Sequence, residues 1–228
     1  MKNNNIIKLN KKVFKPTATS DLLLNSLIKQ KLKGKVLDLG CGSGYLAINL
    51  LKYNKTKIKM YASDVSDDAC KLTKKNAKLN KLLIAVKKGS IFKPWKNDKF
   101  NIIINDVSGI SELVAKKSPW FKNISCKSGP DGTKLTLAVL KDCKKHLLKN
   151  GSIFFPILSL SNEERIFNFL NKKFKKYKII TKHDWVMPKE LMKYRSFLEK
   201  LNKKKIISFQ NKFGLYIWNT KIIYGIPK

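Results

Sequence analysis

The sequence contains few arginines, few histidines and no long apolar run, and each shortage excludes a class of protein. The two histidines, His146 and His183, stand far apart and each is alone, so we interpret them as structural or surface residues and predict no metal site. No apolar run approaches the roughly 18 residues that cross a bilayer, so we predict no membrane span and no membrane partner. The first twelve residues, rich in lysine and asparagine, lack the apolar core of a signal peptide, and we expect the protein in the cytoplasm.

Cysteine is also scarce and scattered. The four cysteines form no C-x-x-C pair, which favours free thiols in a reducing compartment over disulfides or zinc. They are Cys41, Cys70, Cys126 and Cys143.

Acidic residues are few, and the charge is strongly unbalanced. The chain has 49 lysines and arginines against 15 aspartates and glutamates, a net charge of +34. Such a charge attracts polyanions, so RNA is a candidate partner. However, only Arg165 and Arg195 are arginine, the residue best suited to bidentate phosphate and base contacts. The richness in isoleucine and asparagine fits an AT-rich codon bias. A binding surface and compositional drift therefore explain the lysines equally well.

Apolar, β-rich segments alternate with helical patterns along a chain long enough for one domain with a buried core. This alternation predicts an α/β fold with a mainly parallel sheet. The last two of seven predicted strands are poorly separated by crossover helices, which suits an antiparallel edge strand. The predicted strands are residues 35–39, 58–63, 84–87, 100–105, 152–156, 177–182 and 216–224. The predicted helices lie near residues 46–51, 68–79, 134–148, 163–174 and 189–201, and Lys149, Asn150 and Gly151 are expected to form a helix C-cap turn.

A glycine-rich turn follows the first predicted strand. Gly40 and Gly42 permit a tight turn with a bare backbone that a ligand can approach closely, and Gly44 can let the next helix pack against the strand. The spacing G-x-G-x-G differs from the dinucleotide motif G-x-G-x-x-G. Asp38, two residues before the first glycine, would repel a pyrophosphate but can pair with the amino group of a methionine moiety. The string VLDLGCGSG, residues 36–44, resembles the first motif of class I S-adenosylmethionine-dependent methyltransferases. The resemblance implies that Cys41, in the same turn, also lies beside the cofactor.

Two later segments extend this resemblance. Asp64 ends the second predicted strand, where an acidic side chain can accept both hydroxyls of a ribose, although it could instead cap the next helix. Ser90 stands where many relatives have an aspartate that accepts a hydrogen bond from the adenine amino group, and its hydroxyl can still accept that bond more weakly. The resemblance implies S-adenosyl-L-methionine as cofactor and places Val65 and Ile91 beside it.

The segment before the first strand carries a second resemblance. The pattern V-F-x-P-x-x-x-S-x-x-L-L, which includes Pro16 and Ser20, resembles the lead-in of the HemK group, the release-factor glutamine methyltransferases, where it forms a lid over the cofactor. The segment Gly129 to Thr133 resembles the G-x-D-G-L segment of the same group. We therefore expect the Rossmann-like class I methyltransferase fold, with helices on both faces of the sheet. Residues 1–34 would form a lead-in and lid helix, and residues 35–228 the methyltransferase domain.

The fourth predicted strand ends in a motif that departs from the family. Methyltransferases that modify planar nitrogens carry N-P-P-Y or D-P-P-Y there, whereas this chain has Asp106, Val107, Ser108 and Gly109. Asp106 keeps an acceptor for an N–H group, and we predict it as the catalytic residue. The diproline and the aromatic ring are absent. Trp120 and Phe121 could supply the missing ring beside Ser108, or could equally be a loop anchor.

These features leave three functions open. The HemK-like segments favour methylation of a nitrogen in a protein or peptide side chain. The positive charge favours methylation of ribosomal or transfer RNA, and the degenerate motif leaves room for an RNA-binding module without activity. Residues 184–224 either wall the acceptor pocket or cover the sheet edge, and covering is the preferred interpretation. The sequence does not predict the oligomeric state.

Overall fold

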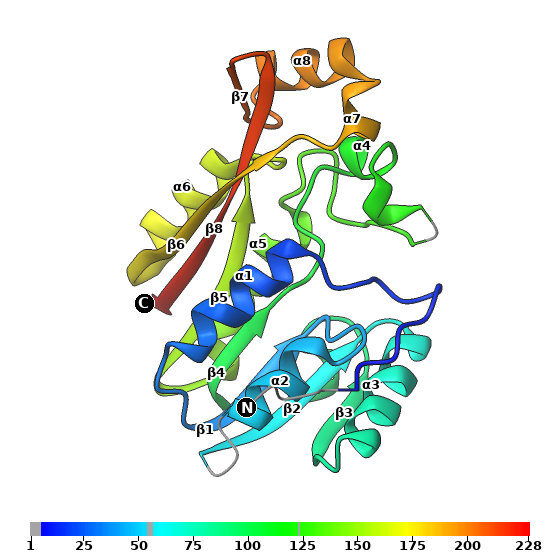
Figure 1. Ribbon diagram of the computed structural model, residues 1–228. Helices are drawn as coiled ribbons and strands as arrows, with labels where there is room; N and C mark the ends of the chain where they lie inside the picture. Colours follow the sequence, from blue (N-terminus) through cyan, green and yellow to red (C-terminus); the bar gives the residue numbers. More distant parts are fainter. Residues whose placement is uncertain (1–5, 54–56, 123) are drawn as a thin grey trace.

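The computed structural model describes residues 6–53, 57–122 and 124–228, and a mixed β-sheet forms its centre (Figure 1). The strand order is β3-β2-β1-β4-β5-β8-β6, and the short strand β7 pairs with β8 outside this path. The described strands are β1 Gly34–Leu39, β2 Ile58–Asp64, β3 Ile84–Lys88, β4 Phe100–Asn105, β5 Leu147–Leu158, β6 Phe174–Val186, β7 Gln210–Lys212 and β8 Leu215–Pro227.

The direction of the strands decides where a site can form. Strands β1 to β5 are parallel, and β8 runs antiparallel between β5 and β6. The carboxyl ends of β1, β2 and β4 therefore meet at one edge of the sheet, beside which open α/β sheets bind their ligands. The predicted α/β class with an antiparallel strand at one side is confirmed, and β7 is an additional strand that the sequence did not predict.

Helices cover both faces of the sheet. On one face, α1 Ala18–Ile28 and α2 Tyr45–Tyr53 bury leucines against Val36, Met60 and Ile104. On the other face, α5 Lys134–Asp142 and α6 Glu163–Lys173 pack against a core that includes Phe155 and Ile103. The helix α3 Asp67–Leu79 packs against β3 and β2. Ser66 is its N-cap, and the Ser66 hydroxyl accepts a hydrogen bond from the Ala69 amide.

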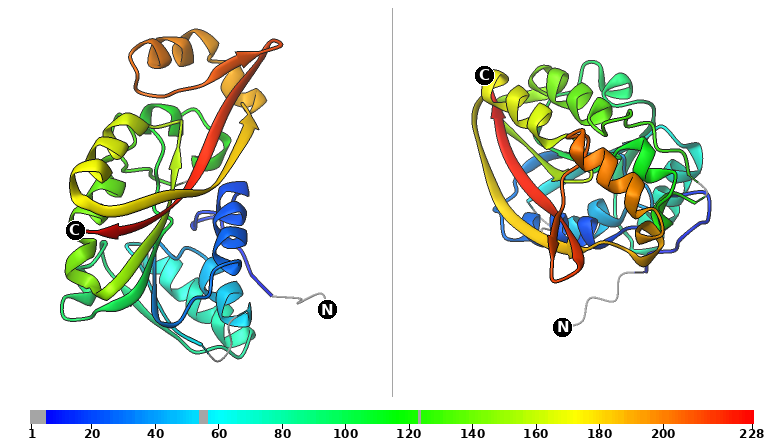
Figure 2. Two further views of the ribbon diagram at one scale, coloured as in Figure 1. Left: turned by 90° about the vertical axis from the view of Figure 1, so that its left-hand side faces the viewer. Right: turned by 90° about the horizontal axis from the view of Figure 1, so that it is seen from above.

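A smaller core lies beyond the carboxyl ends of the central strands. It joins α4 Glu112–Ala115, α7 Lys189–Met192, α8 Arg195–Lys203 and the β7–β8 hairpin, with Leu198 and Leu201 at its centre. Figure 2 shows β6 and β8 reaching past the other strands toward this part of the molecule. The carboxyl-terminal segment therefore does more than cover a sheet edge.

Two predicted helices and one predicted helix cap differ from the structure. The helix predicted for residues 134–148 ends at Asp142 and continues only as a 3-10 turn, Cys143–His146. Asn150, with φ 65°, lies inside β5 at a pairing irregularity instead of in a helix C-cap. The helix predicted for residues 189–201 is divided into α7 and α8. The two helix predictions were correct in kind and wrong in extent, whereas the predicted C-cap turn is part of a strand.

No helix in the described part of the chain is long and apolar enough to cross a membrane. The division of the chain at residue 34 stays a prediction. The helix α1, which precedes it, packs closely on α2 and also contacts β5, β6 and β8.

Candidate active site

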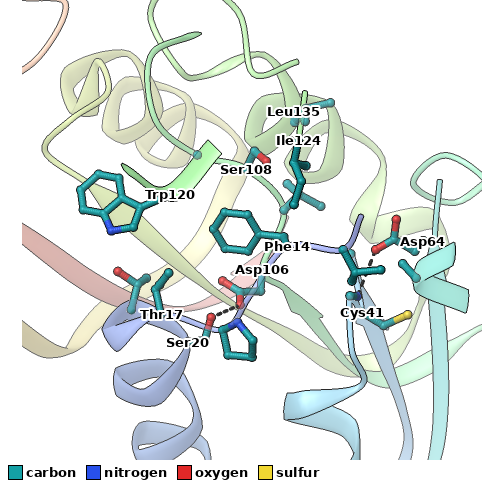
Figure 3. Close-up of a pocket in the computed structure, with 18 of the residues that line it drawn as sticks. Phe14, Thr17, Ser20, Cys41, Asp64, Asp106, Ser108, Trp120, Ile124 and Leu135 are labelled. Carbon is teal, nitrogen blue, oxygen red and sulfur yellow. Dashed lines mark hydrogen bonds between the residues drawn. The ribbon is translucent and has the colours of Figure 1, made fainter. Parts of the chain in front are cut away.

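A cavity of about 700 Å³ lies beside the carboxyl ends of β1, β2 and β4 (Figure 3). This volume falls in the range of about 300–1,000 Å³ that small-molecule sites occupy. Of the predicted site residues, all but Gly44 line it. They are Pro16, Ser20, Asp38, Gly40, Cys41, Gly42, Asp64, Val65, Ser90, Ile91, Asp106, Ser108, Trp120 and Phe121.

The turn after β1 approaches the cavity with bare backbone. Gly40 has φ 77°, and a Cβ there would lie 3.2 Å from Val107 Cγ1, so a side chain would crowd the segment after β4. Gly42 has φ 53°, and its N–H donates to Asp64 Oδ2 at 3.0 Å. Asp64 Oδ1 accepts the Ser66 amide at 2.9 Å. One carboxylate thus ties the turn after β1 to the turn after β2.

The helix α3 holds this turn from behind. Thr73 Oγ1 donates to the Gly42 carbonyl at 3.0 Å, and the amide of Asn76 donates to the Ser43 carbonyl at 2.9 Å. Gly44 does not line the cavity. It lies against α3, because a Cβ at this position would come within 3.0 Å of Thr73 Cγ2. The sequence had predicted instead that Gly44 lets the next helix pack against the strand. The sequence reasoning missed Thr73 and Asn76, which stand one helical turn apart on an otherwise ordinary amphipathic helix.

Carboxyl groups dominate the charge of the cavity interior. Asp38 is 1 % exposed, and neither of its side-chain oxygens has a hydrogen-bond partner in the described chain. Burial, followed by the carboxylates of Asp106 and Asp64, raises the pKa of Asp38 to about 8, and the Ala47 amide acts weakly in the opposite direction. Burial also raises the pKa of Asp106 to about 6, while the Ser20 hydroxyl, which donates to Oδ2 at 2.9 Å, lowers it.

The amino-terminal segment crosses the cavity and is fastened at both ends. The amide group of Asn76 donates to the Lys8 carbonyl at 2.9 Å and accepts the Lys8 N–H at 3.0 Å. Asn80 holds Ile6 by a similar pair of hydrogen bonds. At the other end α1 begins, and its Ser20 reaches Asp106. Phe14 and Val13 between these points line the cavity.

The segment Gly129–Thr133 supports the loop after β4 from outside the cavity. Gly132, with φ 76°, lies so close to Ile110 and Ser111 that a Cβ would come within 2.6 Å of their backbone. The Gly129 amide donates to Glu112 at 2.7 Å, and Asp131 pairs with Arg165 at 2.7 Å. This glycine- and aspartate-containing segment therefore positions the Asp106–Gly109 region indirectly.

Aromatic rings form the end of the cavity away from the glycine turn. Figure 3 shows Asp106 between Trp120 and Thr17 on one side and Cys41 and Asp64 on the other. The Trp120 ring lies 5.7 Å from Trp218, which lies 6.1 Å from Trp185, measured between centroids. Trp120 and Phe121 line the cavity and also pack against neighbouring rings, so both roles weighed from the sequence stay open.

Trp185 and Trp218 were not predicted as site residues. Both come from the carboxyl-terminal segment and line the cavity, so that segment walls it, contrary to the preferred interpretation that it only covers the sheet edge. A signal existed in the sequence: tryptophan is rare here, and two of four tryptophans stand in that segment.

The histidines pack against aromatic rings, and the cysteines are dispersed over the structure. His146 stacks on Phe92 at 4.3 Å, and His183 is exposed and lies against Trp185 at 4.0 Å. All four cysteines are free, and the residues described contain no cluster able to hold a metal ion.

The cavity suits a cationic ligand with a nucleoside part better than a phosphate. Three carboxyl groups line it, including the unpartnered Asp38, while Lys12 and Lys127 are its charged nitrogens among the described residues. A buried carboxyl without a partner lacks the hydrogen bonds that an amino group would supply. Asp64 and Ser90 add acceptors where a ribose and a base would lie. The residues present therefore fit S-adenosylmethionine.

Comparisons with known proteins agree with this geometry. The family model of the methyltransferase small domain matches residues 12–106. The release factor glutamine methyltransferase of Aquifex aeolicus is 34% identical over 164 residues, which are 67% of this chain and 57% of that protein. A putative protein N5-glutamine methyltransferase of Methanocaldococcus jannaschii is 29% identical over 72% of this chain and 81% of its own length.

A solved structure supports the fold across nearly the whole chain. The ribosomal protein L11 methylase of Lactobacillus delbrueckii subsp. bulgaricus superimposes with a TM-score of 0.60 and 21% identity, over 98% of this chain and 86% of that one. The chain thus spans little more than half of the Aquifex relative but has a complete class I methyltransferase fold. The fold is that of the class I methyltransferases, and the sequence is similar to the release factor glutamine methyltransferases, the HemK group, as predicted.

Proposed function

We propose that the protein uses S-adenosylmethionine to methylate a nitrogen atom in a protein or peptide side chain. The observation that carries this proposal is the position of Asp106, which lies in the cavity between the acidic glycine turn and an aromatic wall. The similarity of the chain to proteins named as release factor and protein glutamine methyltransferases supports a protein side chain as the acceptor.

Residues on the glycine-turn side of Asp106 would hold the cofactor. Asp38 would hold the amino group of the cofactor, Asp64 the ribose hydroxyls and Ser90 the base, while Gly40 and Gly42 let it lie against bare backbone. When bound, the cofactor supplies a methyl group activated by a sulfonium. The segment of Val13 and Phe14 crosses the cavity and would exclude water from this group.

Asp106 is suited to orient the acceptor nitrogen and to take its proton. With a pKa of about 6 it is ionised at neutral pH, and its one hydrogen bond, from Ser20, leaves acceptor capacity free. Most of the rate enhancement would come from holding the two reacting groups in line.

The arginines do not favour RNA as the acceptor, because both are paired within the protein. Arg165 pairs with Asp131, and Arg195 donates to Glu199 at 3.1 Å and to Tyr216 at 2.8 Å. Both guanidinium groups are therefore engaged within the protein, and lysines alone would contact a nucleic acid. This favours nonspecific attraction over a built recognition surface.

Incubation with methyl-labelled cofactor tests the proposal. The purified protein is mixed separately with total protein and total RNA of the source organism, and we expect label in protein, recovered as an N-methylated residue after digestion. Label in RNA alone would overturn the proposal. A titration calorimetry experiment that finds no binding of S-adenosylmethionine would indicate a module without activity.

A further inference from the structure

The first turn of α1 makes one hydrogen bond to each side of the cavity. Ser20 Oγ donates to Asp106 Oδ2, after β4, at 2.9 Å. The next residue, Asp21, accepts a hydrogen bond from the hydroxyl of Tyr45, which directly follows Gly44 of the glycine turn. Two adjacent residues of one helix therefore join the loop after β4 to the turn after β1.

The hydroxyl of Ser20 is committed to this carboxylate. Ser20 is 5 % exposed, and its Oγ has no other hydrogen-bond partner in the described chain. An ionised carboxylate only accepts hydrogen bonds, so the hydroxyl is the donor. Rotation about χ2 of an aspartate is otherwise only loosely restricted. The bond to Oδ2 therefore fixes the plane of the carboxylate and leaves Oδ1 free to accept from a ligand.

The backbone after β4 restricts Asp106 less than the related motif would. Where that motif has two prolines, which fix φ, this chain has Val107 and Ser108, followed by Gly109. A segment of this composition needs a contact from another element to hold the side chain in one orientation. The first turn of α1 supplies that contact through Ser20.

The same bond also affects the charge of Asp106. Asp106 takes part in no ion pair of the described chain. Burial raises the pKa of Asp106, and the Ser20 hydroxyl lowers it. The other charged groups that line the cavity are Asp38, Asp64, Lys12 and Lys127. Ser20 is thus the group in contact with Asp106 that favours its ionised form.

We propose that Ser20 is a positioning residue for methyl transfer, whose hydroxyl holds Asp106 so that the free carboxylate oxygen faces the acceptor nitrogen. The sequence placed Ser20 in a lid over the cofactor, and this inference gives it a task on the acceptor side. The inference rests on the proposed function. It adds that α1 sets the orientation and the ionisation of Asp106, whichever nitrogen-containing group is the acceptor.

Removal of the hydroxyl tests the inference in the full chain. In Ser20→Ala we expect the acid limb of kcat/KM for labelling of protein to move up by about one pH unit, because the ionised carboxylate loses its donor. At pH 8, where Asp106 is ionised in both proteins, kcat/KM should still be about tenfold lower, mainly through kcat, because the orientation is lost. The affinity for S-adenosylmethionine, measured by calorimetry, should stay within about twofold.

Two variants of the same helix separate this effect from a general loss of structure. Ser20→Thr keeps the hydroxyl and should keep the acid limb of the wild type. Ser26→Ala is the matched control, because Ser26 is 4 % exposed, donates to Thr181 Oγ1 at 2.9 Å and lies outside the cavity. It should leave the acid limb and kcat/KM unchanged. A loss of cofactor affinity in Ser20→Ala that matches its loss of kcat/KM would assign Ser20 to the cofactor and overturn the inference.

The carboxyl group of Asp106 gives a readout that needs no turnover. The NMR shift of its carboxyl carbon, assigned with Asp106→Asn, is followed as the pH is varied in the free protein. We expect the midpoint to rise by about one pH unit in Ser20→Ala and to stay in place in Ser20→Thr and Ser26→Ala. An unchanged midpoint in Ser20→Ala would overturn the inference and leave the proposed function standing. Failure of the wild type to label protein would refute the proposed function, and this inference with it.

Discussion

At the scale of single residues, the cavity places two carboxyl groups in environments that separate their tasks. Asp38 has no hydrogen-bond partner in the described chain and the higher pKa, whereas Asp106 keeps one hydroxyl donor and a pKa nearer neutrality. Two acids held at different pKa values can bind a cation and accept a proton in the same site.

Asp38 should link cofactor binding to proton release. With a pKa of about 8 it is mostly protonated at pH 7 in the free protein, and an ammonium group would ionise it. We expect up to one proton to be released on binding of S-adenosylmethionine, measured by calorimetry in buffers of different ionisation enthalpy. Asp38→Asn should bind the cofactor far more weakly and release no proton; the same release in this variant would assign the proton to another group.

The same group should make the free protein less stable as the pH rises. The folded pKa of Asp38 lies above its ordinary value of 3.8, so between about pH 4 and 8 the unfolded chain binds fewer protons than the folded one, and the free energy of unfolding falls. Asp38→Asn should remove this loss and raise the free energy of unfolding at pH 7.5 by up to about 5 kcal/mol. Urea unfolding at pH 5 and pH 7.5 measures the difference, which should be about a third as large at pH 5.

Asp106 should control the acid limb of activity. Because its pKa in the free protein is about 6, kcat/KM should fall as the pH drops below 6 and the carboxylate becomes protonated. Asp106→Ala should lower kcat by about 10²–10⁴ while the cofactor affinity changes little. Asp106→Asn should lose the acid limb. If the alanine variant loses cofactor affinity and turnover to the same extent, Asp106 belongs to the cofactor site instead.

At the scale of elements, the parallel half of the sheet could be predicted more accurately than the antiparallel half. The first four strands were predicted within one residue of their observed ends, because short apolar runs end at glycine- or aspartate-containing turns. Strands β6 and β8 each extend three or more residues beyond one predicted end. Most residues of β6 are exposed or half-buried, and its length is defined by pairing with β8, which a local pattern does not encode. The glycine turn and Asp106 were found from local motifs, whereas Trp218 and Asn76 reach the site by tertiary contacts that no local pattern encodes.

Gly132 should matter to the loop after β4 for steric reasons. Gly132→Ala would combine a positive φ with a Cβ within 2.6 Å of backbone, and we expect a loss of roughly 2–4 kcal/mol in the free energy of unfolding. Gly214→Ala is the control, because Gly214 has almost the same φ, 75°, and open space around it. That variant should lose about 1 kcal/mol. Equal losses in urea unfolding would mean that φ alone decides the effect.

Asn76 should couple the amino-terminal segment to the glycine turn. Asn76→Ala leaves the Ser43 and Lys8 carbonyls without their donor, and we expect a loss of about 1–3 kcal/mol in stability and faster hydrogen exchange at Lys8 and in the glycine turn. Asn80→Ala removes the exposed pair with Ile6 and the bond from its amide to the Asn76 carbonyl, but no bond to the glycine turn, so exchange should speed up near Ile6 and not in the turn. Unchanged exchange in the turn of the Asn76 variant would show that the two regions move independently.

At the scale of the whole molecule, the surface and the cavity carry opposite charges. A chain with net charge +34 lines its cavity with three carboxyl groups, and each of its two exposed arginines pairs with a carboxylate of the same chain. The exterior therefore attracts polyanions without the fork-shaped donors that recognise them, while the interior attracts a cation. Association with nucleic acid and methyl transfer should consequently respond to different conditions.

Salt should separate these two properties. Lysine–phosphate contacts release counterions, so binding of total RNA in a filter or anisotropy assay should weaken steeply between about 50 and 200 mM salt. The cavity interactions are buried and screened much less, so kcat/KM for labelling of protein should change only a few-fold over the same range. Added RNA should inhibit labelling at the low salt concentration and not at the high one. A loss of labelling that parallels the loss of RNA binding would instead mean that the acceptor reaches the cavity as part of a nucleic acid complex, and the lysine-rich surface would then belong to the recognition of the substrate.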